Sequence, residues 1–222
     1  LASTLTKNLT DKSTWNLGFT IAGNKGFHYQ TMEDMLGATS FHNVNNYAIG
    51  TFSRYSDAVQ YDLNRPNALV GNGDKFGYDY NINVVCANVW SNYAETRGIF
   101  HYNIAAKVSY DAMNRDGKMR NGLFVNNSYG KSKTARFLSG GGKFAGSIDV
   151  GHGNVLSLGL GYEAKSPNAN VAFQAPEMNN DFVQNLKNEL VFSSELSYQL
   201  STPWLHANLS GYYNRVTNAT EW

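Results

Sequence analysis

Residues 98–110 read GIFHYNIAAKVSY, and the alternation in this stretch decides the fold class. Every second position from Phe100 to Tyr110 is apolar or aromatic, whereas His101 and Lys107 fall on the intervening positions. Successive side chains of a β-strand point to opposite faces of a sheet, so this pattern predicts a strand with one apolar and one polar face. The stretch also exceeds the roughly 9–11 residues that a tilted strand needs to cross a membrane.

The same alternation recurs along the chain and predicts about eight strands. The other segments that carry it, some weakly, are 2–9, 15–22, 78–92, 136–150, 156–162, 186–200 and 205–214. Short connections are expected near residues 10–13, 94–96, 151–153 and 201–203, and long ones at about 24–77, 114–134 and 165–181. Short and long connections alternate, so an antiparallel meander places all the short turns at one end. Outer-membrane barrels show this asymmetry.

The fold class predicted from these patterns is all-β, namely an antiparallel up-and-down transmembrane β-barrel segment with about eight strands of a larger barrel. The whole chain, 1–222, is interpreted as one partial barrel domain. A soluble β-sandwich is the alternative, but its strands usually run about 5–6 residues. Aromatic residues also gather near the predicted strand ends, as they do in interfacial girdles. In the first long connection, Thr31 is expected to cap a helix at 32–36, and Ser56 a helix at 57–63.

Composition excludes several classes of protein. The chain has 18 basic and 17 acidic residues, a net charge of +1 and no basic cluster, so nucleic acid is not an expected partner. Cys86 is the single cysteine, which rules out an internal disulfide. Mean hydropathy is −0.41, as expected when only one face of each strand is apolar. The chain begins at Leu1 without a recognisable secretory leader, and both ends are expected to be cut from a longer protein.

Residues that carry chemistry are sparse. The five histidines lack metal-ligand spacing, and no nucleophile–base constellation is visible. We therefore expect no enzyme activity, no catalytic residues, no metal and no cofactor. The candidate ligand-binding residues lie in the two longest predicted loops, where they would meet a ligand or anionic lipopolysaccharide. They are His28, His42, Arg115, Lys118 and Arg120.

Several blocks of the chain resemble a known family. They are GDKFGYDYNIN at 73–83, RDGKMRNGLF at 115–124, NSYGKS at 127–132, NLKNE at 185–189 and GYY at 211–213. These blocks are similar to the barrel region of TonB-dependent outer-membrane receptors of Bacteroidetes-type bacteria. The resemblance specifies the type of receptor but no particular nutrient.

The resemblance implies a barrel that surrounds a plug domain, resides in the bacterial outer membrane and takes up a nutrient with energy supplied through the TonB complex. Outer-membrane lipid, lipopolysaccharide, the plug of the full-length chain and the TonB complex are the implied partners. Neither a plug nor a TonB box is recognisable in the 222 residues. Two alternatives stay open, a structural or adhesive barrel that does not transport and a soluble all-β binding module.

Overall fold

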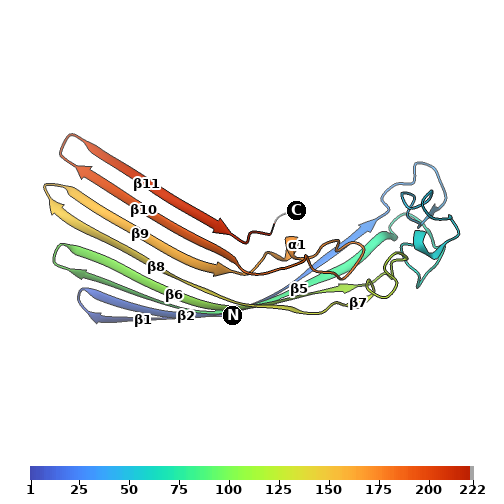
Figure 1. The fold of residues 1–222 in the computed structure, drawn as a ribbon, viewed down its shortest axis with the longest axis horizontal. Coiled ribbons are helices and arrows are strands. Elements are labelled where there is room, and N and C mark those ends of the chain that lie inside the picture. Colours follow the sequence, from blue (N-terminus) through green and yellow to red (C-terminus); the bar gives the residue numbers. More distant parts are fainter. Residues whose placement is uncertain (221–222) are drawn as a thin grey trace.

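The computed structural model describes residues 1–220 and consists mainly of one large antiparallel sheet (Figure 1). Its strand order is β1-β2-β5-β6-β8-β9-β10-β11, with β7 paired to β6. The long strands are β1 (Ala2–Thr10), β2 (Ser13–Thr31), β5 (Lys75–Arg97), β6 (Phe100–Gly117), β8 (Ala135–Gly151), β9 (Asn154–Lys165), β10 (Glu189–Ser201) and β11 (His206–Thr217). The short elements are β3 (Phe41–His42), η1 (Asp57–Val59), β4 (Leu69–Val70), β7 (Gly130–Lys131) and α1 (Ala169–Ala172).

The predicted all-β, up-and-down topology is confirmed, since each long strand pairs with the next long strand in sequence. Four tight turns gather at one end of the sheet, and three long segments, 32–74, 118–134 and 166–188, leave the other end (Figure 1). The sheet is curved but does not close on itself within residues 1–220, so β1 and β11 each leave one edge unpaired there.

One predicted turn is in the wrong place. The sequence suggested 94–96, but β5 continues to Arg97 and pairs there with Phe100. Gly98 makes the turn, because its φ of 64° lies in the left-handed region that glycine adopts without strain. Glu95 stays in the strand, and its carboxylate accepts hydrogen bonds from the hydroxyls of Tyr93 and Tyr102.

Of the two helices expected in the first long segment, one is present in shortened form and the other is absent. Ser56 does cap a helix, accepting a hydrogen bond from the amide of Ala58 at 3.2 Å, but this 3₁₀ helix ends at Val59. The helix at 32–36 is absent, because β2 continues to Thr31 and the backbone of Met32 still pairs with Asp74 and Gly73. None of the helices formed by residues 1–220 is long and apolar enough to pass through a membrane.

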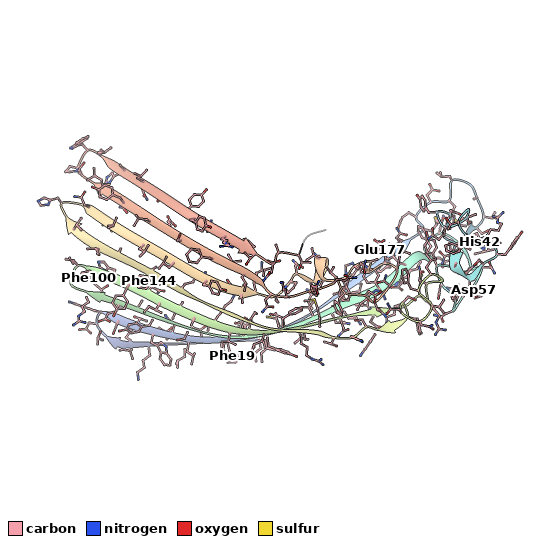
Figure 2. The ribbon with its side chains drawn as sticks, viewed as in Figure 1. Phe19, His42, Asp57, Phe100, Phe144 and Glu177 are labelled. Atoms are coloured by element: carbon pink, nitrogen blue, oxygen red, sulfur yellow. The ribbon has the colours of Figure 1, made fainter. Side chains whose placement is uncertain are left out.

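Register divides the sheet into two chemically distinct faces, since residues opposite each other on neighbouring strands point the same way. The apolar face carries Leu17, Phe19, Ile21, Val85, Ala87, Val89, Ile104, Ala106, Val108, Tyr110, Leu138, Phe144, Ile148, Leu156, Leu158, Leu160, Tyr162, Phe192, Leu196, Tyr198, Leu209 and Tyr213. The polar face carries Asn16, Thr20, Asn88, Asn103, Lys107, Ser109, Lys143, Ser157, Glu163, Ser193, Glu195, Asn208 and Ser210. Phe19 extends from the convex side of the curved sheet, and α1 lies on the concave side (Figure 2).

Large apolar side chains of the sheet are well exposed. On the apolar face Val108 is 59% and Leu138 71% exposed, whereas on the polar face Ser109 and Ser139 are each only 8% exposed. Within residues 1–220 no second sheet covers the apolar face. The main buried hydrophobic cluster instead lies on the concave side, where the segment between β9 and β10 folds over the sheet.

The tight turns are staggered along the sheet. At the tight-turn end, the second hairpin extends two residues beyond the first. The third extends three residues beyond the second, and the fourth one residue beyond the third. The pairs that define this stagger are Ser13 with Glu95, Phe100 with Ile148, and Asn154 with Leu200. With a rise of about 3.3 Å per residue and a strand spacing of about 4.8 Å, a stagger of about one residue per strand places the strands about 35° from the normal to the line of turns.

Candidate functional site

An ion pair crosses a glycine on the polar face. Lys107 Nζ lies 2.6 Å from Glu163 Oε1, and the register places Gly141 between them on the intervening strand. A Cβ at this glycine would lie 2.6 Å from the carbonyl oxygen of Tyr162. Glycine is therefore required by the backbone packing, and the absence of a side chain leaves the two charged groups free to meet above it.

A hollow of about 380 Å³ extends beside this ion pair. Its lining includes Trp90, Gly141, Lys143 and Ser193. The indole ring of Trp90 lies over Gly18 of β2, where any Cβ would overlap it. The concave surface thus offers an aromatic ring, charges of both signs and a floor of small residues, in a volume typical of small-ligand sites.

The three long segments interlock into a unit that we call the loop platform (residues 32–74, 118–134 and 166–188). The amide of Gly122 donates to the carbonyl of Gln60 at 2.9 Å, joining the first and second segments. The amide of Asn180 donates to the carbonyl of Asn127 at 2.8 Å, joining the third to the second. Gly122 is also forced to be glycine, because a Cβ would overlap the backbone of Asp57.

Arg115 lies at the base of this platform and is only 2% exposed. Its Nη1 donates to the carbonyl of Ser128 and to Oδ1 of Asn180, both at 2.7 Å, and its Nε donates to the carbonyl of Pro176 at 2.5 Å. The guanidinium also lies 4.9 Å from the centre of the Tyr80 ring. One side chain therefore fixes two loop segments to the wall of the sheet.

Burial shifts both members of this cation–aromatic contact away from their charged forms. It lowers the pKa of Arg115 to about 10, and it raises the pKa of Tyr80 to about 12, with a smaller contribution from Glu177. At neutral pH Arg115 is still a cation and Tyr80 a neutral phenol. The contact is therefore a constant part of the structure at physiological pH.

A second cavity, of about 390 Å³, lies between the polar face and the start of the third segment. Its lining includes Asn24, His28, Asp111 and Lys165. His28 stacks on Tyr80 with ring centres 4.8 Å apart and planes 6° from parallel. The Asp111 carboxylate accepts hydrogen bonds from Ser166 Oγ at 2.9 Å and Ser139 Oγ at 3.4 Å. This cavity therefore presents a half-buried imidazole, an ordered carboxylate and a lysine.

The structure relocates two of the candidate binding residues. His28 and Arg115 were predicted in loops, but they lie in β2 and β6, because strand pairing continues beyond the alternating segments. His42 lies in β3, Lys118 forms a 2.5 Å ion pair with Asp116, and Arg120 lies 5.5 Å from the Tyr129 ring. The five residues do not converge on one site, and their role in ligand binding stays a prediction.

Asp111 and Lys165 were not singled out from the sequence, and only their polar-face position within a strand could have drawn attention to them. Among residues 1–220 no group of three or more histidine, cysteine or acidic side chains is arranged to hold a metal ion.

Comparison with known proteins adds no assignment: no family model, no curated protein and no solved structure matches the chain.

Proposed function

We propose that this chain forms part of the wall of an outer-membrane transport receptor, with the apolar face against lipid and the polar face towards the lumen. The observation that carries the proposal is the exposed apolar face, which runs across seven strands from β2 to β11. In water such a surface would be strongly unfavourable, at roughly 25 cal/mol per Å² of apolar area. In lipid it needs no protein cover.

The extent of the apolar face matches a membrane. On β5 it runs from Val85 to Tyr93, and on β8 from Leu138 to Ile148, without a charged residue on that face. These spans correspond to the roughly 9–11 residues of a tilted transmembrane strand. Charged residues follow just beyond the band, among them Lys25 on β2.

Strand inclination and aromatic placement agree with this reading. The inclination of about 35° derived from the turn stagger falls at the lower end of the range of barrel strands. Near the tight turns the apolar face carries Trp15, Tyr93 and Tyr102, and at the other border it carries Tyr110 and Tyr162. Trp and Tyr are enriched at both membrane–water interfaces.

The transport role rests on the family resemblance, and the architecture is compatible with it. The loop platform would meet the nutrient outside the cell, and the polar face would guide it inward past a plug carried by the full-length protein. Coupling to the TonB complex would come from that plug region. Lipid and lipopolysaccharide would cover the convex side.

Two experiments separate this proposal from its alternatives. Flotation with phospholipid vesicles, followed by electrophoresis of unheated and heated samples, should show a vesicle-bound species whose migration changes on heating. Failure to float would support the soluble all-β module. If the protein floats, uptake of candidate nutrients by cells with and without the gene distinguishes a receptor from a structural or adhesive barrel.

A further inference from the structure

The segment between β9 and β10 does not project away from the sheet. It crosses the concave side above β8 and β6 and reaches β5, where Phe173 packs in the cluster with Tyr80, Ile82 and Met113 (Figure 1). Phe173 is 1% exposed and Ala172 is fully buried. The segment that follows β9 thus covers the polar face of β6 and β5, which lie two and three positions from β9 in the sheet.

The crossing segment has an ordered fold of its own. The backbones of residues 172–174 and 181–183 run antiparallel, with Val183 N donating to Ala172 O at 2.9 Å and Gln174 N donating to Asp181 O at 3.0 Å. The rings of Phe173 and Phe182 stack with centres 4.6 Å apart. We call residues 169–183 the strap.

Arg115 fastens the strap to the wall, through its hydrogen bonds to Pro176 and Asn180. The three oxygens that receive the guanidinium are neutral, and among residues 1–220 no carboxylate forms an ion pair with it. A second fastening joins Asn127 Nδ2 to Asp181 Oδ1 at 2.7 Å. Segments that open and close usually have few buried contacts. The strap differs from them at its centre, where Ala172 and Phe173 are buried, and at Asn179, which is 4% exposed.

We infer that the strap is a fixed partition which narrows the passage along the polar face, with Arg115 as its positioning residue. A solute would then travel beside the strap and meet the cavity that contains His28 and Asp111 at the strap's base. This inference rests on the proposed transport function. It adds that size selection occurs at an immobile element of the wall.

The first test measures access by chemical labelling. Cys86 is replaced by serine, His28 by cysteine, and the vesicle-bound full-length protein is treated with a small charged thiol reagent or with a bulky polymer-linked maleimide. We expect the small reagent to label position 28 and the bulky reagent to react at least ten times more slowly. Replacing residues 169–183 with a short Gly-Ser linker should remove that difference.

A cysteine introduced at Asn208, on the polar face of β11 and away from the strap, serves as the matched control. Its labelling should be unchanged by removal of the strap. Equal rates of bulky labelling at position 28 with and without the strap would overturn the inference. Because only vesicle-bound protein is labelled, failure of the membrane proposal is recognised separately, by the absence of a floating fraction.

The second test measures whether the strap is fixed. Amide hydrogen exchange at residues 172–183 should be as slow as in neighbouring strands and should accelerate at least tenfold in Arg115→Met. Arg120→Met, which removes an exposed guanidinium from the same platform, should leave this exchange unchanged. Fast exchange of these amides in the unmodified protein would mean that the strap is mobile.

Discussion

At the scale of single residues, the two faces of the sheet explain which substitutions matter. Leu158 on β9 and Leu209 on β11 both belong to the exposed apolar face. We expect Leu158→Arg or Leu209→Arg to lower the free energy of unfolding by about 2–4 kcal/mol, because a cation near the bilayer midplane loses its hydration. Urea unfolding of the protein in phospholipid vesicles measures this change.

Asn208→Arg is the control for Leu209→Arg, since the side chain of Asn208 points to the polar face. It should change stability by less than about 1 kcal/mol, because that face already carries charged groups and meets water. Equal tolerance of arginine at positions 208 and 209 would reject the assignment of the convex face to lipid.

Gly141 gives a second residue-scale prediction. Gly141→Ala should destabilise the protein by about 1–3 kcal/mol, because the new methyl group would press on the backbone of β9. Gly211→Ala is the control, since nothing lies within 4 Å of a Cβ there. Denaturant midpoints that coincide for the two variants would contradict the close approach of β8 and β9.

The environment of a residue is predictable from the sequence where it follows from the residues next to it in the chain. The face of Phe100 or Val108 was predictable because alternation reports it directly. The role of Arg115 was not, because its three acceptors lie 13, 61 and 65 residues away in the chain. Its charge suggested an exposed ligand contact, whereas the fold buries it.

At the scale of elements, the eight long strands were predictable, but where they end on the side of the loop platform was not. β2 was expected to end near residue 22 and continues to Thr31. Beyond the apolar band the alternation of apolar and polar side chains disappears, while backbone pairing with β5 continues to Lys75. The period of two in the sequence therefore marks only the part of a strand that lies inside the apolar band.

The first loop segment offers an element-scale test. Met32 N donates to Asp74 O at 3.0 Å, and Gly73 N donates to Met32 O at 2.7 Å, so the ends of this segment are already adjacent. Replacing residues 33–72 with an Asn-Gly turn should preserve membrane assembly, since such a turn suits a two-residue hairpin. Heat-dependent migration of the vesicle-bound variant checks this, and loss of the heat-sensitive species would mean that assembly depends on the segment.

At the scale of the whole molecule, the exposed apolar face and the unpaired sheet edges together determine how the chain behaves in water. The 222-residue chain should not exist in water as a single folded monomer, because within residues 1–220 the apolar face is uncovered and β1 and β11 each have an unpaired edge. Size-exclusion chromatography with light scattering should show aggregates in buffer and a smaller, defined species in detergent. A monodisperse monomer that unfolds cooperatively in buffer would instead support a soluble all-β protein.

The alternation of side chains also bears on how such a chain reaches its destination. Machinery that inserts helices responds to hydropathy averaged over about 19 residues, and a period of two keeps that average low. Leucine at every polar position of β6, which has 18 residues, should therefore divert the chain into the inner membrane, as seen by fractionation of cells. In the unaltered sequence, the apolar face of each strand does not raise the mean hydropathy of consecutive residues. The apolar surface forms only when neighbouring strands pair into a sheet. Under the proposed function, such a chain would therefore pass the inner membrane without being retained there and would insert into the outer membrane.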